Sequence, residues 1–403
     1  MINVIGLGYI GLPTALILAA NGQKIIGTDI NKQTIEQLEN KQLPFEEEGI
    51  DELFQEALVN DIWFQLDYAQ TDCYIITVPT PYLGKSRKID TTYLTAAIKS
   101  VLKKCLPETM LIIESTVSPG TIDSIIKPLI VKEGLVIGRD IQLVHAPERI
   151  LPGQMITELK NNSRTIGADN PKTAEKAKAI YASFCKGEIV CTTIKTAEMT
   201  KVVENTYRAV NIAFSNELSQ LCQEGQMNVY DIIEIANKHP RVNILTPGPG
   251  VGGHCIPIDP WFLVGDYPQQ TELIQKALKI NESRPEYVLK KAAEIAKEHG
   301  LSPAEIGIYG MTYKKDVEDT RDSPTMQLFN YLDKQMGYPF NVYDPLVKKK
   351  VLESQLLNFD EFLEKSRLVI VMVDHQHLID HKTCLEEKII LDTRHCLVGS
   401  YFL

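Results

Sequence analysis

Hydrophobic residues recur in short continuous runs along the first half of the chain, and helical or turn-rich segments separate these runs. Runs of this length without polar alternation are typical of strands that are buried on both faces of a parallel sheet. They lie at residues 2–5, 24–28, 73–78, 111–114 and 141–145. The pattern predicts a mostly parallel sheet that extends through about residue 195.

The pattern changes after residue 195. Long helical periodicity continues to about residue 300, with one irregular interruption at 238–260. Strand-like runs then return at 306–309, 340–343, 368–373 and 389–391, with helices near 323–332 and 359–365. The sequence therefore predicts an α/β protein with two Rossmann-like doubly wound domains joined by a central helical region. The expected domains are 1–195, 196–300 and 301–403, and the helical region is a candidate dimerisation surface.

A glycine-rich turn follows the first predicted strand and opens a helix. Gly6 allows the tight turn, Gly8 lets the main chain approach a pyrophosphate, and Gly11 permits close packing of the helix. Asp29 ends the second strand, where a carboxylate suits the ribose hydroxyls of NAD and repels the 2′-phosphate of NADP. This arrangement predicts NAD binding; the alternative is a glycine turn in a domain that binds no dinucleotide.

Length and charge favour a multi-domain enzyme over a nucleic-acid or membrane partner. The chain has 403 residues, a hydrophobic content of 44% and a net charge of −10. The negative charge argues against nucleic acid or an anionic membrane as the main partner. No apolar stretch approaches the roughly 20 residues of a membrane span, and residues 1–20 are interpreted as a functional strand and helix instead of a signal peptide. We expect a cytoplasmic protein.

The eight cysteines are scattered along the chain. They form no Cys-x-x-Cys pair, so reduced thiols are favoured over a disulfide framework. Cys255 and Cys396 each follow a histidine, but neither pair has a second ligand pair at metal spacing. No metal site is expected.

One cysteine lies in a segment of unusual composition. Residues 248–260, Gly-Pro-Gly-Val-Gly-Gly-His-Cys-Ile-Pro-Ile-Asp-Pro, surround Cys255 with glycines and prolines. Glycine allows the backbone to approach a ligand, and proline keeps the loop stiff. Cys255 is therefore a candidate nucleophile. The alternative is a small core cysteine without reactivity.

Polar residues share one face of the helix that begins the central region. Lys201, Asn205 and Arg208 fall at i, i+4 and i+7. A stripe of this kind is often only a solvated face. An amide and two cations that converge on Cys255 would instead lower the pKa of its thiol and donate to an oxyanion.

Further polar segments follow predicted strands, at the edge where open α/β sheets bind ligands. They are 78–81 (Val-Pro-Thr-Pro), 114–117 (Glu-Ser-Thr-Val) and 145–153 (His-Ala-Pro-Glu-Arg-Ile-Leu-Pro-Gly). Each could be turn chemistry alone, but three at one sheet edge favour a binding site.

Together these motifs resemble the UDP-glucose/GDP-mannose dehydrogenases, a family of NAD-dependent enzymes that act on sugar nucleotides. The resemblance covers essentially the whole chain. It includes the glycine turn, Glu-Ser-Thr-Val, Pro-Glu-Arg-Ile-Leu-Pro-Gly, the Lys201 helix, the Cys255 loop and the segment 313–324, Tyr-Lys-Lys-Asp-Val-Glu-Asp-Thr-Arg-Asp-Ser-Pro, in family order.

The resemblance implies a four-electron oxidation of the sugar C6 alcohol to a carboxylate, with two NAD⁺ as acceptors. Cys255 would trap the intermediate aldehyde as a thiohemiacetal, and the second oxidation would give a thioester. By the same resemblance Lys201 and Asn205 stabilise the C6 oxygen, and Lys201 also transfers a proton. Glu148 would activate the hydrolytic water, directly or through a network ordered by Thr116 and Asp259.

The resemblance also implies the binding residues and the assembly. The expected NAD contacts are Gly6, Gly8, Tyr9, Ile10, Gly11, Asp29, Thr80, Thr116 and Arg321. The expected UDP-sugar contacts are Arg149, Ile150, Lys201, Asn205, Arg208, His239, Arg241, Gly252, Tyr313, Lys314 and Arg394. A homodimer or higher homo-oligomer is expected, and Arg241 is a candidate contribution from a neighbouring subunit.

Within the family, Pro-Glu-Arg-x-x-Pro-Gly and the segment 239–244 resemble the branch that acts on UDP-N-acetylmannosamine. UDP-glucose members usually have Pro-Glu-Phe-Leu and an acid where this chain has Pro152. Pro257, however, resembles UDP-N-acetylglucosamine members, so that sugar and UDP-glucose stay open as alternatives. From other classes, a two-electron β-hydroxyacid dehydrogenase and a non-catalytic NAD sensor share parts of the pattern. Neither needs Cys255.

Overall fold

The computed structural model places the boundary between two units of the chain within a single long helix. It describes residues 1–83, 86–335 and 340–403. The units are Met1–Glu204 and Asn205–Leu403, and the helix that holds their boundary is α8 (Ile194–Glu224). Among the described residues, no helix combines the length and the hydropathy that crossing a membrane requires.

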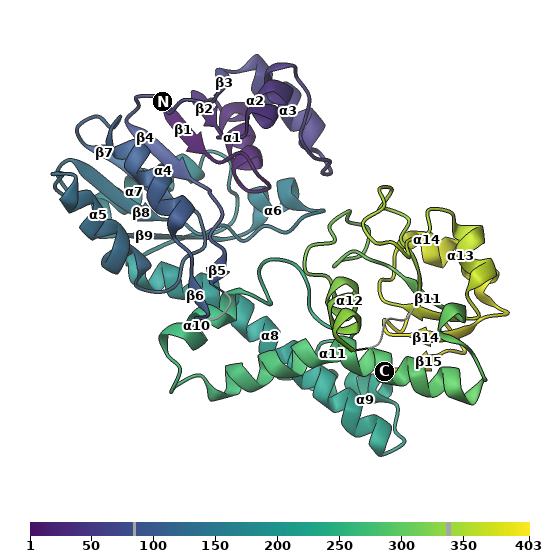
Figure 1. Cartoon of the computed structure of the whole chain (residues 1–403). Coiled ribbons are helices and arrows are strands. Elements are labelled where there is room, and N and C mark those ends of the chain that lie inside the picture. The colour runs from purple at the N-terminus through teal and green to yellow at the C-terminus, as the bar shows by residue number, and fades with distance from the viewer. Residues whose placement is uncertain (84–85, 336–339) are drawn as a thin grey trace. The chain divides into compact units, whose positions relative to one another are not determined.

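The first unit is built on a sheet that has eight strands among the described residues (Figure 1). Neighbouring pairs are parallel except β8 with β9, which are antiparallel with His145 opposite Gly167. The spatial order is β10 (Ile189–Thr192), β9 (Arg164–Ala168), β8 (Ile141–His145), β7 (Thr109–Ile113), β4 (Cys73–Ile76), β1 (Ile2–Ile5), β2 (Ile25–Thr28) and β3 (Ile62–Gln65). The chain order reverses between β1 and β4, which is where doubly wound sheets bind ligands.

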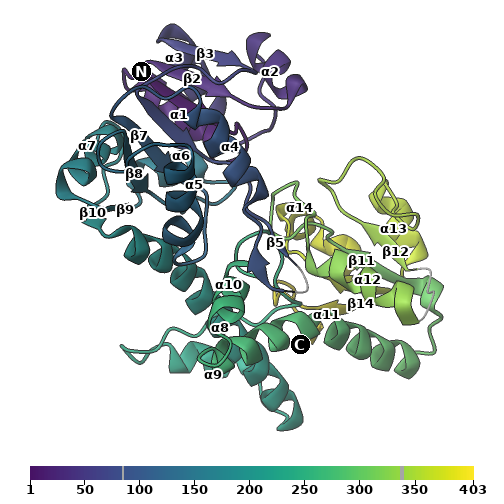
Figure 2. The ribbon, with the colours of Figure 1, turned by 60° about the vertical axis from the view of Figure 1, so that its left-hand side comes forward.

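Helices cover both faces of this sheet (Figure 2). One core contains residues of α1 (Gly11–Ala20), α2 (Lys32–Glu39), α3 (Ile50–Val59), α6 (Met155–Asn161) and α7 (Pro171–Tyr181). The other contains residues of α4 (Thr92–Leu102), a π-helical turn at Ile122–Ile126 and α5 (Lys127–Lys132). A short hairpin of β5 (Tyr82–Leu83) and β6 (Lys88–Ile89) is antiparallel. Because both faces are covered, the central strands are apolar throughout.

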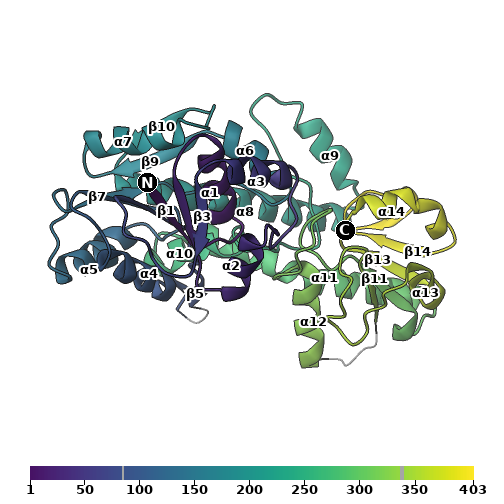
Figure 3. The same ribbon diagram turned by 90° about the horizontal axis from the view of Figure 1, so that it is seen from above.

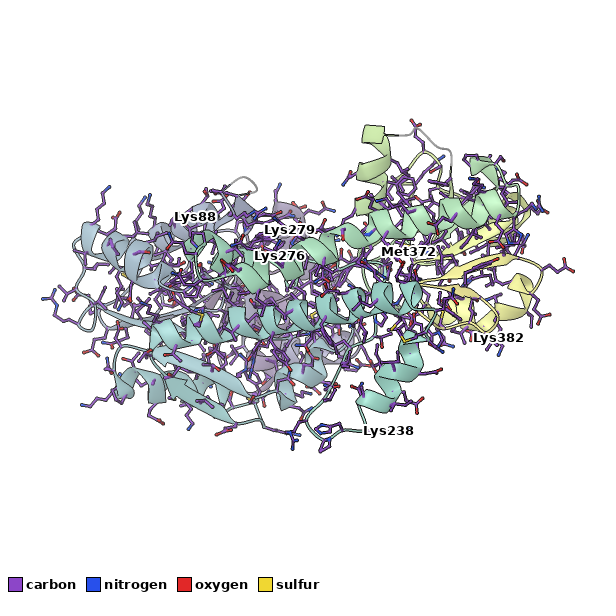
Figure 4. The ribbon with its side chains drawn as sticks, turned by 90° about the horizontal axis from the view of Figure 1, so that it is seen from below. Lys88, Lys238, Lys276, Lys279, Met372 and Lys382 are labelled. Carbon is purple, nitrogen blue, oxygen red and sulfur yellow. The ribbon has the colours of Figure 1, made fainter. Side chains whose placement is uncertain are left out.

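The second unit begins with the remainder of α8 and three further helices. They are α9 (Val229–Ala236), α10 (Asp259–Asp266) and α11 (Glu272–Glu298). The helices α8 and α11 lie side by side (Figure 4, where Lys276 and Lys279 mark α11). Asn216 Nδ2 donates to Asn281 Oδ1 at 3.0 Å, and Asn281 Nδ2 donates to the Ala209 carbonyl at 2.9 Å. These buried amides fix the pairing of the two helices.

A second parallel sheet completes this unit (Figure 3). Its order is β12 (Asn341–Tyr343), β11 (Ile306–Tyr309), β13 (Leu368–Val371), β14 (Ile389–Asp392) and β15 (Tyr401–Phe402). One core includes residues of α11 and α12 (Pro324–Gln335). The other includes residues of α13 (Phe359–Lys365) and α14 (Gln376–Asp380). The sheet is thus also covered on both faces.

The predicted fold class is confirmed, with one mostly parallel and one parallel α/β sheet and a helical region between them in the chain. The predicted strands of both sheets are present, with ends that differ by at most a few residues. Six strands of the described residues were not predicted: β3, β5, β6, β9, β10 and β15. The bounds of the three expected domains stay a prediction.

Candidate functional site

The turn between β1 and α1 is shaped to receive a phosphate group. A Cβ on Gly11 would lie 1.8 Å from the Gly6 carbonyl oxygen and 2.3 Å from Thr77 Oγ1, so only glycine lets α1 start this close to the turn. A Cβ on Gly8 would meet no atom within 4 Å, so the space above this residue is open. The N-cap residue Ile10 makes no side-chain cap, and the first turn of α1 holds no acid. The amides of this turn can therefore donate to an anion.

Asp29 stands directly after β2 and is bonded to the same turn. Its Oδ2 accepts a hydrogen bond from the Leu7 amide at 2.7 Å, and its Oδ1 accepts one from the Asn31 amide at 2.8 Å. Each carboxylate oxygen has further lone pairs, so Asp29 can still accept from ribose hydroxyls. This position beside the glycine turn is the one expected of the acid in a dinucleotide site.

The other predicted cofactor residues of this unit lie around the same sheet edge. Tyr9 is 39% exposed, and its ring centroid is 4.5 Å from that of Phe45. Thr80 Oγ1 donates to the Thr116 carbonyl at 2.6 Å, and Ser115 Oγ donates to the Val78 carbonyl at 2.7 Å. These bonds join the segments that follow β4 and β7. The side chains at the edge are therefore held by local hydrogen bonds.

Glu148 follows β8 and belongs to a buried ionic cluster. Its Oε1 accepts from the Arg149 amide at 2.6 Å, and its Oε2 pairs with the guanidinium of Arg164. Arg149 itself pairs with Glu204 at 2.6 Å, and Ile150 is buried beside it. The sequence reasoning did not find Arg164. Its signal is weak, because Arg-Thr-Ile-Gly-Ala is a short strand that contains a glycine.

The polar stripe on α8 is partly buried. Lys201 and Asn205 are 8% and 6% exposed, whereas Arg208 is exposed. A fully solvated face would leave all three in water, so that interpretation does not hold for the first two. Asn205 Nδ2 donates to Asp259 Oδ2 at 2.7 Å, and Asp259 is 4% exposed. Burial of a polar amide or a carboxylate costs free energy unless each group has a hydrogen-bond partner, and this bond supplies one to both.

Cys255 is exposed and lies just before α10. Its carbonyl accepts from the amides of Ile258 and Asp259 at 3.1 and 2.9 Å, which fixes the loop on the helix. Gly253 has a φ of +85° and its amide donates to the Arg321 carbonyl at 3.2 Å. A Cβ on Gly252 would lie 2.8 Å from Tyr313 Cβ. The loop thus presents the thiol from a rigid backbone that packs against the segment of Tyr313 and Arg321.

A small pocket lies at the carboxyl ends of β11 and β13. Its polar lining includes Tyr313, Lys314, Lys315 and Arg394, and Pro249 and Gly250 of the Cys255 loop form part of its wall. Arg394 Nε pairs with Asp374 at 3.1 Å. Three cations against one acid suit an anionic ligand, and this is the ligand edge of a parallel sheet. Three predicted substrate residues, Tyr313, Lys314 and Arg394, therefore come together here.

Three further predicted site residues, Arg321, His239 and Arg241, also lie in exposed positions. Arg321 pairs with Asp319 at 2.5 Å, close in the chain to Tyr313. His239 and Arg241 follow α9 on the surface, and the Arg241 amide donates to His239 Nδ1 at 3.3 Å. Neither His239 nor Arg241 lines the pocket that contains Lys314.

Comparison with known proteins gives three family matches in chain order. They are the UDP-glucose/GDP-mannose dehydrogenase family NAD binding domain over residues 1–185, its central domain over 195–283 and its UDP binding domain over 307–399. The first match contains the glycine turn and Asp29, and the last contains the Lys314 pocket. A nicotinamide dinucleotide therefore fits the first unit, where the observed turn has room for it.

Relatives of known name match nearly the whole chain. The UDP-N-acetyl-D-mannosamine dehydrogenase of Methanococcus maripaludis is 41% identical over 99% of this chain and 93% of its own length. A solved UDP-N-acetyl-mannosamine dehydrogenase from S. aureus is 39% identical, covers 100% of this chain and 96% of its own, and has a TM-score of 0.89. The UDP-D-ManNAc dehydrogenase from Pyrococcus horikoshii is 35% identical, with coverage of 100% and 98% and a TM-score of 0.91. The chain belongs to the UDP-glucose/GDP-mannose dehydrogenase family and is an NAD-dependent oxidoreductase.

Proposed function

We propose that the protein oxidises the C6 alcohol of UDP-N-acetylmannosamine to a carboxylate in two successive two-electron steps. The observation that carries this proposal is the buried hydrogen bond between Asn205 and Asp259. It joins the helix that carries Lys201 to the helix that follows the Cys255 loop. Neither a two-electron dehydrogenase nor an NAD sensor has a use for a thiol held in this way.

The first unit supplies the residues that would hold NAD. Gly6, Gly8 and Gly11 shape the turn, Tyr9 and Ile10 would flank the pyrophosphate, and Asp29 would accept hydrogen bonds from the ribose. Thr80 and Thr116 complete the set in this unit, and Arg321 of the second unit is also proposed to contact NAD. NAD⁺ supplies a hydride acceptor for each oxidation when it is bound. Asp29 favours NAD over NADP, because its charge would repel a 2′-phosphate.

Residues of α8 and the Cys255 loop would carry the oxidation. Lys201 accepts the proton of the C6 hydroxyl as the hydride leaves, and Asn205 stabilises charge on the C6 oxygen. The Cys255 sulfur then adds to the aldehyde carbon, and the oxygen takes up a proton from Lys201 to give a thiohemiacetal. Loss of that proton and of the second hydride leaves a thioester on Cys255. Covalent capture keeps the aldehyde in place between the two oxidations.

Hydrolysis of the thioester would use Glu148. Its carboxylate removes a proton from water, the hydroxide adds to the thioester carbon, and the C–S bond breaks to regenerate the Cys255 thiolate. Thr116 and Asp259 are proposed to order the network around this water. One sugar alcohol, two NAD⁺ and one water therefore give one carboxylate, two NADH and three protons.

The sugar nucleotide would be held by cations of the second unit and of the Glu148 segment. Lys314, Tyr313 and Arg394 are proposed to bind the UDP, supported by the pocket that they line. The remaining proposed contacts are Arg149, Ile150, Lys201, Asn205, Arg208, His239, Arg241 and Gly252. Arginine suits a diphosphate, because its planar donors match two oxygens at once.

We infer N-acetylmannosamine as the sugar because relatives at 35–41% identity over nearly the whole chain bear that name. The Pro-Glu-Arg segment, which contains Glu148 and Arg149, supports the same branch. UDP-N-acetylglucosamine and UDP-glucose are the competing substrates. We place the reaction in the cytoplasm, where reduced thiols and NAD are present.

A homodimer is proposed through α8. Tyr207, Phe214 and Leu221 are spaced by seven residues and are 66%, 52% and 62% exposed, so they form one apolar stripe on the helix. A stripe with this spacing can pack against its own copy. Arg241 is a candidate contribution to the site of the neighbouring subunit.

The experiment that tests the function is the count of NADH per sugar with a panel of UDP-sugars. We expect two NADH per UDP-N-acetylmannosamine and one uronate product. One NADH per substrate would indicate a two-electron dehydrogenase, and none with any sugar would indicate a sensor. Faster oxidation of UDP-glucose would overturn the proposed sugar.

A further inference from the structure

Strand β9, which is antiparallel to its neighbour β8, brings a cation to the ligand edge of the first sheet. In a parallel sheet the last residues of each strand lie at that edge, but β9 runs in the opposite direction. His145 is opposite Gly167, so the start of β9 lies beyond the end of β8. Arg164, the first residue of β9, therefore reaches Glu148. The Arg164–Glu148 ion pair therefore results from the direction of β9, and not from closeness of the two residues in the sequence.

Arg164 is built into a buried site. Its side chain is 6% exposed, and its guanidinium lies 4.7 Å from the ring centroid of Tyr181 and 5.1 Å from that of Phe184. The two rings hold the guanidinium by stacking and cation–π contact. Its Nη2 pairs with Glu148, while its buried Nη1 makes no hydrogen bond. The cation is thus fixed in place by groups other than its ionic partner.

A second carboxylate faces the other side of the same cation. Glu114, which follows β7 and is 2% exposed, has its Oε1 3.9 Å from Arg164 Nη1. Tyr181 Oη donates to that same oxygen at 2.6 Å. Thr14 Oγ1 lies 3.5 Å from Glu114 Oε2. The guanidinium therefore lies between two carboxyl groups: Glu148 is in contact with it, and Glu114, which accepts from Tyr181, lies farther away.

In this arrangement Glu148 Oε1 accepts a hydrogen bond from the Arg149 backbone amide, and Oε2 pairs with the Arg164 guanidinium. A base that takes a proton from water must keep one lone pair directed at that water. Two fixed donors on opposite oxygens restrict the rotation of the carboxylate and so set the direction of the remaining lone pairs. Loss of Arg164 would free this rotation.

We propose that Arg164 is a positioning residue that orients Glu148 for thioester hydrolysis, and that Tyr181 protects this pairing by holding Glu114 away from the guanidinium. The inference rests on the proposed function, in which Glu148 activates the hydrolytic water. It predicts a selective defect. The oxidation steps proceed, but the acyl group remains on Cys255.

The test uses Arg164→Lys and Tyr181→Phe in the full-length protein. Lysine keeps the charge but cannot hold the carboxylate with a planar fork. For Arg164→Lys we expect turnover to fall about 10-fold to 100-fold, part of what a general base contributes. For Tyr181→Phe we expect about a fivefold loss, as for one hydrogen bond. In both, the first turnover still yields two NADH, and mass spectrometry detects a uronyl adduct on Cys255.

Arg139→Lys is the matched control, since Arg139 is exposed and pairs only with its neighbour Asp140 in the described structure. It should hydrolyse the thioester as the unmodified protein does. A merely structural role for Arg164 would slow all steps together and leave no adduct. If Arg164→Lys does not fold, Tyr181→Phe decides alone. Absence of the adduct in the folded variants overturns the inference, whereas absence of two NADH from the unmodified protein overturns the proposed function instead.

Discussion

Asn205 Nδ2 donates to Asp259 Oδ2 at 2.7 Å, and both side chains are buried. The bond links α8 to the first residue of α10, four positions after Cys255. A buried carboxylate needs a partner, so each residue fixes the other. The position of the Cys255 loop therefore depends on a residue that the sequence places on a distant helix.

Replacement of Asn205 by alanine should separate this pair. The Asp259 carboxylate would remain buried without its amide donor, and we expect a loss of about 1–3 kcal/mol in the free energy of unfolding. NADH production should fall about 100-fold if Asn205 also stabilises the C6 oxygen. Chemical denaturation and steady-state kinetics measure the two effects. Asn211→Ala, on the same helix, is the control, and equal effects of both variants would contradict this role.

Alanine at two glycines of the first turn should give opposite results. At Gly8 the new Cβ meets no protein atom, so stability should change by less than about 0.5 kcal/mol while NAD affinity falls at least about 10-fold. At Gly11 the Cβ would overlap the Gly6 carbonyl, and we expect a loss of more than about 2 kcal/mol of stability. Calorimetric titration with NAD and thermal unfolding separate the two. Normal NAD binding by Gly8→Ala would argue against the proposed pyrophosphate position.

Stability should fall as the pH rises because of Glu114. Burial raises the pKa of this carboxyl to about 7, while Arg164 acts in the opposite direction. A folded-state pKa above the unfolded value means that the stability contribution is complete below about pH 4.5 and is lost as the pH rises through about 7. Glu114→Gln should remove this pH dependence, which amounts to on the order of 1–3 kcal/mol in the free energy of unfolding across the range. Denaturation midpoints between pH 4.5 and 8 measure it, and an unchanged slope would contradict the account.

An acidic residue on the apolar stripe of α8 should weaken association. Phe214→Asp places a charge where the proposed dimer buries a ring, and we expect the dimer dissociation constant to rise at least about 100-fold. Sedimentation velocity at several concentrations measures it. Val398→Asp is the control, because Val398 is fully exposed and lies outside the stripe. A dimer that persists in Phe214→Asp would place the interface elsewhere.

The sequence predicted those features that depend on local pattern. Continuous apolar runs located most strands. The glycine spacing and Asp29 located the turn after β1, in which the Leu7 amide donates to the Asp29 carboxylate. It did not reveal β9, whose five residues include a glycine and whose antiparallel direction no local pattern encodes. Arg164 was missed for that reason. Its role follows only from where β9 begins relative to β8.

The role of Asp344 is a second feature that the sequence could not predict. This residue follows β12 in the same way that Asp29 follows β2. Its Oδ2 accepts from the Met311 amide at 2.5 Å, in the same way that Asp29 accepts from Leu7. Asp344 is buried, however, and also bonds to His375 at 3.2 Å. Sequence spacing alone could not distinguish the two acids, because the difference arises from a histidine far along the chain.

The central claim is that Cys255 carries the sugar between the two oxidations. The direct measurement is product analysis of Cys255→Ala with UDP-N-acetylmannosamine and NAD⁺, alongside NAD binding by the same variant. The account predicts that no uronate forms while NAD binding is unchanged, because the thiol is needed for capture and not for the cofactor. Normal uronate output from this variant would contradict the thioester route.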